Sequence, residues 1–241
     1  MIETFAALLF AHVLADFVFQ TNWIAENKLR PHVLLLHGVI VLVTAAAATG
    51  RIDVWQLGVL ALVHIAIDWA KGSFAPEGLK GFVADQSAHL LSIAILAVFV
   101  PSLFAGGLWA GITFLPALMT LAAGAVLVTR AGGFAIGLLM QPWSHVELPK
   151  GLMNGGKLIG LLERGLIFLL VLVGQPVGIG FLIAAKSVLR FETTSNDQRA
   201  GEYVIIGTLA SFGWALLFSY ATVWLMAALP PLSVTDMSGS H

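Results

Sequence analysis

The chain has 241 residues, of which 59% are hydrophobic and only 10% are charged, and its mean hydropathy is +0.93. An ordinary soluble domain carries about 25% charged residues, so the 12 basic and 13 acidic side chains are too few to cover a soluble globule. A disordered chain is excluded as well, because it needs few apolar and many charged residues. The net charge of −1 predicts no nucleic-acid partner, and the lack of cysteine excludes disulfides and thiolate metal sites.

Long, continuous apolar runs predict membrane-spanning helices, since each span needs about 20 mostly apolar residues. We expect an all-α, polytopic membrane protein in which residues 1–228 form one domain and 229–241 a disordered tail. A short apolar stretch, 131–142, is expected to lie at the interface or to re-enter the membrane. The expected helices, about eight by this length rule, cover residues 3–22, 33–49, 54–71, 83–100, 108–129, 157–174, 177–190 and 203–228.

Basic residues gather in the odd-numbered connections of this arrangement, and such residues mark the cytoplasmic side. Arg51 is the exception, in an even-numbered connection. Both termini are therefore expected outside. The basic residues on the cytoplasmic side would be Lys28, Arg30, Lys71, Lys80, Arg130, Lys150, Lys157, Arg190 and Arg199.

Ionisable side chains are concentrated in the first four expected spans, although each charge at the bilayer centre costs roughly 2.5–3.5 kcal/mol. His12 and Asp16 are four residues apart and share a helix face, and His64 and Asp68 repeat this spacing. A third pair has the opposite order, as expected for a helix that runs the other way. The candidate metal ligands, all expected in the cytoplasmic half, are His12, Asp16, His37, His64, Asp68, Asp85 and His89.

An internal repeat relates these spans, because residues 11–17 match 63–69 in pattern at an offset of 52 residues. The same offset carries His37 onto His89. Residues 1–50 and 54–100 are therefore predicted to be tandem copies of a two-helix unit, followed by C-terminal helices in 108–228. Superposing the copies should bring His12 onto His64, whereas Asp85 has no counterpart in the first copy.

Histidine and carboxylate ligands suit divalent ions of the Zn, Mn, Fe or Mg class, and seven candidates are enough for one or two ions. Paired ions, about 3.5–4 Å apart, typically cleave phosphate esters or amides. The pattern predicts a metal-dependent hydrolase with a metal-bound water as nucleophile and Asp85 as candidate base. Gln20 and Gln86 would orient ligands or bind substrate, and Lys71, with Lys28 and Lys80, would hold a lipid phosphate or another small anion.

Other interpretations stay open. Intramembrane His, Asp and Gln side chains can simply hydrogen-bond helices together in a non-catalytic scaffold. Asp and His chains also serve metal-ion or proton-coupled transporters. Alternatively, Lys28, Lys71 and Lys80 only mark the cytoplasmic side and bind no ligand. Because a transporter needs a route to both faces, the scarcity of ionisable residues in the outer half favours the enzyme.

A second polar cluster lies in the C-terminal half. The simple interpretation is a set of structural ion pairs at Glu163, Arg164 and Glu202, with Glu163 bound to Lys186 or Arg190. The alternative is an anion-binding wall in which Lys186 and Arg190 face the metal site and hold substrate.

Three motifs carry a resemblance to a known family: His12-x-x-x-Asp16-Phe17-x-x-Gln20, His64-x-x-x-Asp68-x-x-Lys71 and Asp85-Gln86-x-x-His89. They resemble the bacterial membrane family of domain of unknown function 3307, and strings such as Gly160-Leu161-Leu162-Glu163-Arg164 are similar to those of its longer members. The resemblance implies a multi-pass protein of the bacterial inner membrane, in contact with the lipid bilayer, and no defined activity. A weaker similarity to inner-membrane metal-dependent hydrolases favours the hydrolase only by analogy. Substrate, metal identity and oligomeric state stay open.

Overall fold

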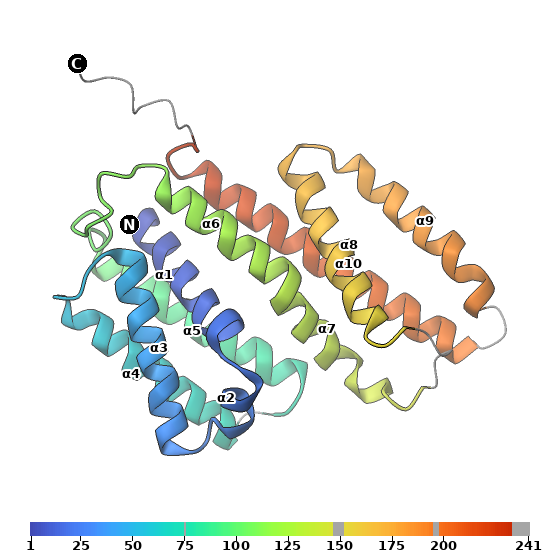
Figure 1. The fold of residues 1–241 in the computed structure, drawn as a ribbon, viewed down its shortest axis with the longest axis horizontal. Coiled ribbons are helices and arrows are strands. Elements are labelled where there is room, and N and C mark those ends of the chain that lie inside the picture. The colour runs from blue at the N-terminus through green and yellow to red at the C-terminus, as the bar shows by residue number, and fades with distance from the viewer. Residues whose placement is uncertain (75, 147–151, 195–197, 233–241) are drawn as a thin grey trace. The chain divides into compact units, whose positions relative to one another are not determined.

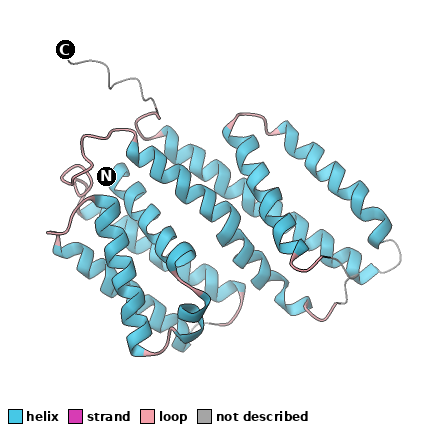
Figure 2. Ribbon diagram, viewed as in Figure 1, coloured by secondary structure: helices cyan, strands magenta, loops and turns pink. Residues whose placement is uncertain are grey.

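The computed structural model describes residues 1–74, 76–146, 152–194 and 198–232, and of residues 189–194 it describes the backbone only. All regular structure in these ranges is helical (Figures 1 and 2). The elements are α1 Ile2–Leu14, the π-turn η1 Ala15–Phe19, α2 Asn22–Asn27, α3 Pro31–Thr49, α4 Trp55–Phe74, α5 Leu79–Phe99, α6 Leu115–Val126, the π-turn η2 Leu127–Ala131, α7 Gly132–Met140, η3 Gln141–Trp143, α8 Gly155–Leu172, α9 Val177–Thr194 and α10 Gln198–Ala227.

Six helical stretches in the described residues are long and apolar enough to cross a membrane, which indicates a multi-pass membrane protein. The two other expected spans correspond to α8, which carries Lys157, Glu163 and Arg164, and to α9, whose apolar part is Val177–Val188. The six stretches are Ile2–Phe19, Pro31–Thr49, Trp55–Phe74, Leu79–Phe99, Leu115–Trp143 and Gln198–Ala227.

The fifth span differs from the expected 108–129. Residues 108–114 form turns, and the helix begins at Leu115 with Pro116 in its first turn, where a missing N–H costs nothing. The helical stretch then continues through η2 to Trp143, so 131–142 is not a separate piece and Arg130 does not lie in a loop. The apolar sequence has no helix-breaking proline between Pro116 and Pro142, and a single exposed arginine does not end a helix.

The chain divides into two compact units, residues 1–123 with 224–241 (unit 1) and residues 124–223 (unit 2). In unit 1, helices α1, α3, α4 and α5 pack around an apolar core that includes Leu8, Leu57 and Ile93. Of the expected tail 229–241, Leu229 is buried and 233–241 lie outside the described residues.

One end of unit 1, here called the closed end, is sealed by the α3–α4 connection and the turns after α5. The buried Leu103 and Phe104 fill the bundle there, while Leu108 N donates to Gly50 O (3.1 Å) and Arg51 Nη1 donates to Gly106 O (3.0 Å). Hydrogen bonds from Arg51 also hold the pKa of the Asp53 carboxyl below its usual value. The closed end therefore consists of tightly bonded backbone over apolar side chains.

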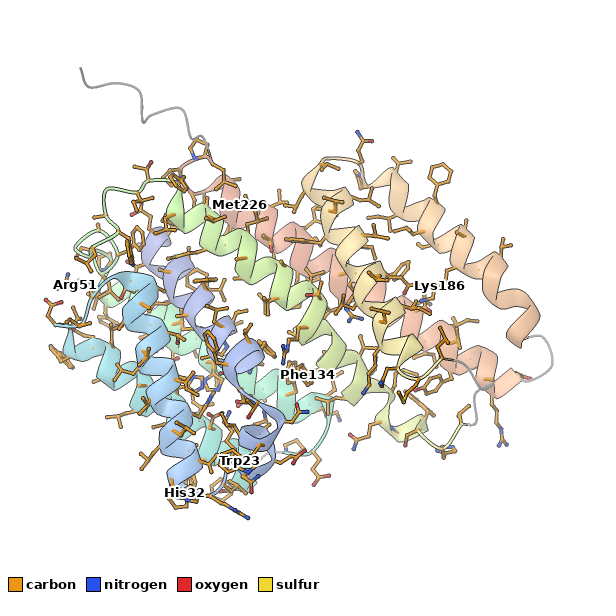
Figure 3. All side chains as sticks on the ribbon, viewed as in Figure 1. Trp23, His32, Arg51, Phe134, Lys186 and Met226 are labelled. Carbon is orange, nitrogen blue, oxygen red and sulfur yellow. The ribbon has the colours of Figure 1, made fainter. Side chains whose placement is uncertain are left out.

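The opposite end of unit 1, here called the α2 end, carries α2 and the α4–α5 connection. Figure 3 shows Trp23 and His32 at this end and Arg51 at the closed end. The chain enters α2 through Thr21, which caps the helix by accepting a hydrogen bond from Ile24 N (3.3 Å).

In unit 2 the π-turn η2 is stabilised by side chains from two other helices. Arg164 of α8 donates to Thr129 O at 2.8 and 3.1 Å and to Ser211 Oγ at 3.2 Å, and Trp214 Nε1 of α10 donates to Leu127 O at 2.9 Å. A π-helical turn shifts carbonyls out of the regular helical ladder, and these side-chain donors add to the Gly132 N–H that already bonds to Leu127 O and Thr129 O.

Candidate metal centre

All seven predicted ligands belong to unit 1 and are buried, with exposed fractions between 0% and 8%. His37 and Asp85 each lie six residues inside their helices, which start at Pro31 and Leu79, so the site lies about 9 Å from the α2 end. The structure thus brings together, from α1 with η1, α3, α4 and α5, the side chains of His12, Asp16, His37, His64, Asp68, Asp85 and His89.

The π-turn η1 shapes one side of this site. Asp16 lies within the turn, which ends at Gln20 in an extended conformation, and the chain then folds into α2. This reversal brings Lys28 back to the site, where its Nζ donates to Gln20 Oε1 (2.9 Å) and lies 2.6 Å from Asp68 Oδ1. π-turns are frequent at functional sites.

Four ligand atoms face one another in the first half of the site, here called the four-ligand group: His37 Nε2, His64 Nε2, Asp16 Oδ1 and Asp68 Oδ2. The two imidazole nitrogens lie 3.1 Å apart. Asp16 Oδ1 lies 3.3 Å from His37 Nε2 and 3.2 Å from His64 Nε2, and Asp68 Oδ2 lies 3.6 and 3.5 Å from the same two nitrogens. Five of the six pairs in this group are therefore between 3.1 and 3.6 Å.

These separations match ligands that share one ion. With metal–ligand bonds near 2.05 Å, neighbouring ligand atoms lie about 3.3 Å apart in a tetrahedron and about 2.9 Å apart in an octahedron. Charge-assisted hydrogen bonds are shorter, about 2.7–2.9 Å. Asp16 Oδ1 and Asp68 Oδ2 are buried and make no hydrogen bond, which is the state expected of oxygens aimed at a cation.

The second half of the site, here called the three-ligand group, contains Asp68, Asp85 and His89. His89 Nε2 lies 3.4 Å from Asp85 Oδ1 and 3.6 Å from Asp68 Oδ1, and neither His89 Nε2 nor Asp85 Oδ1 makes a hydrogen bond. The His89 ring stacks on His64 with centroids 3.9 Å apart. Asp68 belongs to both groups because each of its oxygens faces one of them.

An ammonium group lies on each carboxylate of the three-ligand group. Lys28 contacts Asp68, and Lys71 Nζ donates to Asp85 Oδ2 at 2.8 Å. The Lys71 side chain is 38% exposed and that of Lys28 is 16% exposed, whereas both carboxylates are fully buried or nearly so. The site is therefore accessible from the α2 end, where these two lysines lie.

Gln86 ties the two halves together. Its Oε1 accepts from His12 Nε2 (3.2 Å), and its Nε2 donates to Asp16 Oδ2 and Asp85 Oδ2, both at 3.2 Å. Because His12 uses Nε2 for Gln86, it is left with Nδ1, which is buried without a hydrogen bond, 3.9 Å from Asp16 Oδ1. His12, Asp16 and His64 form a third cluster that can hold an ion.

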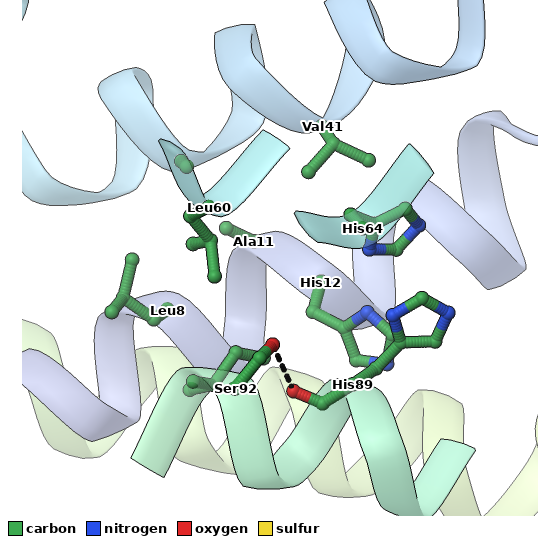
Figure 4. A pocket seen from close by; sticks show the side chains of 10 residues that line it. Leu8, Ala11, His12, Val41, Leu60, His64, His89 and Ser92 are labelled. Atoms are coloured by element: carbon green, nitrogen blue, oxygen red, sulfur yellow. Dashed lines mark hydrogen bonds between the residues drawn. The ribbon is translucent and has the colours of Figure 1, made fainter. Parts of the chain in front are cut away.

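A small cavity lies between the site and the apolar core (Figure 4). His12, His64 and His89 line one side and Leu8 and other apolar residues the other, while Ser92 Oγ donates to His89 O at 2.8 Å. Its volume of about 10 Å³ corresponds to a single water molecule. The cavity can hold a water beside the imidazoles but no substrate.

Residues of the second cluster lie in unit 2. Glu163 pairs with Lys186 at 2.6 Å, and Lys186 Nζ also lies 5.4 Å from the centre of the Phe212 ring. Arg164 bonds to the π-turn η2 rather than to a carboxylate among the contacts described, and Glu202 accepts a hydrogen bond from Gln198. The side chain of Arg190 lies outside the described residues. An anion-binding wall stays a prediction.

The sequence placed Lys28 at the mouth but did not pair it with Asp68. The available signal was electrostatic, because three buried carboxylates require counter-charges and the basic residues nearest to them along the chain are Lys28, Lys71 and Lys80. Lys28 reaches the site because the chain turns back into α2 after the π-helical turn η1. The sequence pattern does not predict that turn.

Comparison with curated proteins finds no match, and comparison with solved structures finds none either. The matched family segment covers residues 4–106, from α1 to the turns that seal the closed end, and it contains all seven candidate ligands. This confirms the resemblance seen in the motifs: residues 4–106 match the family described as Protein of unknown function (DUF3307).

Proposed function

We propose that this multi-span membrane protein is a metal-dependent hydrolase that holds one divalent ion in the four-ligand group. The observation that carries this proposal is the set of five separations of 3.1–3.6 Å among two imidazole nitrogens and two carboxylate oxygens. The hydrogen bonds within the protein leave Asp16 Oδ1 and Asp68 Oδ2 without a donor, although both oxygens are buried. A shared ion satisfies all four atoms at once.

Charge balance favours one ion over two. With neutral imidazoles, as metal ligands must be, three carboxylates and the ammonium groups of Lys28 and Lys71 leave one negative charge in a buried site. One divalent ion changes this to one positive charge, and a second ion would raise it to three. Buried net charge is costly, and the two lysines already occupy the carboxylates of the three-ligand group.

The coordination number decides what the ion can do. Four protein ligands would close the shell of zinc, as in structural zinc sites. An ion such as Mn²⁺ or Fe²⁺, which tolerates mixed imidazole and carboxylate ligands, would leave room for water and substrate beside these four side chains. When bound, it would supply a water of lowered pKa and polarise a phosphoester or amide. Asp85, with its free Oδ1 beside the ion site, is the proposed base.

The proposed orientation puts the α2 end and the metal centre on the cytoplasmic side of a bacterial inner membrane. Lys28, Arg30, Lys71 and Lys80 lie at the α2 end, whereas Arg51 at the closed end is neutralised by Asp53. Whether α8 and α9 both cross the membrane or both do not, the number of spans stays even, so both termini would face outside.

The closed end also argues against the alternative of a transporter. A transported ion or proton would have to leave the site past Leu103, Phe104 and the apolar core, where the cavity has room for about one water. A non-catalytic scaffold, in turn, would not need four ligand atoms aimed at one point.

Metal analysis of protein purified in mild detergent tests the proposal. After supplementation with Mn²⁺ or Zn²⁺, wild-type protein should retain about one ion per chain, and chelation should lower its Tm because the folded state loses a ligand. His64→Ala should lose the ion and phosphoesterase activity together. Glu163→Gln, which breaks a partly buried pair in unit 2, should lower Tm but keep the ion.

The proposal fails if wild-type protein is metal-free after supplementation and neither Mn²⁺ nor Zn²⁺ changes its Tm or its activity. Retention of zinc without any hydrolysis would identify a structural metal site. The hydrogen-bonded scaffold would then be the better account.

A further inference from the structure

We propose that the lysine-flanked three-ligand group is the binding site for the phosphate of a membrane lipid, so that the substrate is lipid-borne. This inference rests on the proposed function, because it names the substrate class of the same site. Its physical basis is the position of two ammonium groups, the net charge of the ion-loaded centre and the character of the α2 end.

The first step concerns the two lysines. Lys28 and Lys71 lie on Asp68 and Asp85, which bracket His89, so the three-ligand group has an ammonium group on each side. Each ammonium has three donors. Lys28 uses donors for Asp68 and Gln20, and Lys71 uses one for Asp85, so both retain donors for an anion's oxygens.

The second step concerns charge. Once the four-ligand group holds a divalent ion, the buried centre carries one excess positive charge. A phosphate group compensates it, and phosphate oxygens accept the hydrogen bonds that lysine donates. A bound phosphate would lie on the side of Asp68 that faces His89, where Lys28 contacts Asp68 Oδ1, because the other Asp68 oxygen faces the four-ligand group.

The third step concerns the α2 end, where Lys28 and Lys71 lie. Exposed aromatic side chains lie on the elements that form this end, and such residues mark the level of lipid headgroups. Exposed Arg30 and Lys80 add two positive charges, against the exposed acids Glu26 and Glu77 on the same connections. The aromatic residues are Phe19 (49% exposed), Trp23 (52%), Trp69 (52%) and Phe74 (78%).

Together these features favour a lipid over a free solute. The site lies about 9 Å from the helix ends at the α2 end, within reach of a headgroup whose acyl chains remain in the bilayer. A phosphate attached to acyl chains gains affinity from the membrane, which inorganic phosphate does not.

The test measures binding to the Mn²⁺-loaded protein in mild detergent by calorimetry. The probes are dihexanoyl phosphatidic acid, dihexanoyl phosphatidylcholine and inorganic phosphate. Phosphatidic acid should bind at least tenfold more tightly than either of the others. Lys28→Gln and Lys71→Gln should each weaken it about tenfold or more, as the loss of a charged hydrogen bond predicts. Lys157→Gln, an exposed lysine of unit 2, is the matched control and should change nothing.

Lys28→Arg and Lys71→Arg keep the positive charge and should retain most of the binding, which separates anion recognition from a loss of folding. Equal binding of inorganic phosphate and phosphatidic acid would overturn the lipid assignment, as would undiminished binding by both glutamine variants or an equal loss in the Lys157→Gln control. Metal content is measured on the same samples. If the protein binds no ion but still binds phosphatidic acid through these lysines, the metal proposal is wrong. The lipid-binding site is then retained.

Discussion

At the scale of single residues, Gln86 has an unusual position for a neutral side chain. Its amide contacts His12, Asp16 and Asp85, and so it links α5 to α1 across the site. Each of these partners is ionisable and buried, and each has another atom without a hydrogen bond. Gln86 therefore helps to orient Asp16, whose free Oδ1 belongs to the four-ligand group, and Asp85, the proposed base.

We expect Gln86→Ala to lower metal affinity about 10- to 100-fold while leaving every ligand in place, because partners that orient ligands typically contribute this much. Titration of the purified variant with Mn²⁺, followed by the rise in Tm, measures the change. Gln56→Ala, on α4 near the closed end, is the control and should bind like wild type. Equal affinities for the two variants would show that Gln86 does not orient the site.

The sequence predicted which residues form the site but not how they divide it. Pairs such as His64 with Asp68 follow from helix spacing alone, because residues four apart share a face. The contact of His37 with His64 and the two-sided role of Asp68 depend on how α3 and α4 pack, which no local pattern specifies. Lys28 was not paired with Asp68 for the same reason, since α2 folds back only after the π-turn η1.

At the scale of elements, the contact between α3 and α4 depends on Gly38. A Cβ on Gly38 would collide with Ile65 Cδ1 and lie only 2.8 Å from Ile65 Cγ1. Gly38 follows His37 and Ile65 follows His64, so this close approach lies beside the two imidazole nitrogens, which are 3.1 Å apart. The glycine therefore favours the close α3–α4 contact beside the four-ligand group, where an added Cβ would displace the end of the Ile65 side chain.

Gly38→Ala should cost about 1–3 kcal/mol through overpacking and should weaken metal binding, because α3 moves away from α4. Thermal unfolding and metal titration measure the two effects. Gly58→Ala is the matched control on α4, since no atom lies within 4 Å of its added Cβ, and a helical Gly-to-Ala change in open space gains up to about 1 kcal/mol. If Gly38→Ala binds Mn²⁺ as tightly as Gly58→Ala, the helix contact does not set the site.

Helix boundaries show where the sequence was less informative. The first four spans were predicted within a few residues, because their apolar runs end at polar or Pro-containing connections. The fifth was wrong at both ends: residues 108–114 are apolar yet form turns over the closed end, and Arg130 lies inside a continuing helix. Hydropathy cannot distinguish an apolar loop that lies over the end of a bundle from the first turn of a span.

At the scale of the whole molecule, unit 1 has two unlike ends. The closed end has hydrogen-bonded backbone, the buried side chains of Leu103 and Phe104, and Arg51 paired with Asp53. The α2 end has the lysines, the exposed aromatics and the route to the candidate metal centre. This asymmetry suits the proposed hydrolase, whose substrate would enter and whose product would leave on one side. The tandem repeat predicted from the 52-residue offset stays a prediction.

The orientation of unit 1 is directly measurable, because the chain contains no cysteine and any introduced thiol is unique. Glu77→Cys at the α2 end and Asp53→Cys at the closed end are both exposed positions. In intact cells a membrane-impermeant maleimide should label Asp53→Cys only, and Glu77→Cys should react only after the membrane is opened. The physical reason is the excess of basic residues at the α2 end, which are retained on the cytoplasmic side. Labelling of Glu77→Cys in intact cells would reverse the orientation and put the metal centre in the outer half of the membrane. The substrate would then have to come from the outer leaflet.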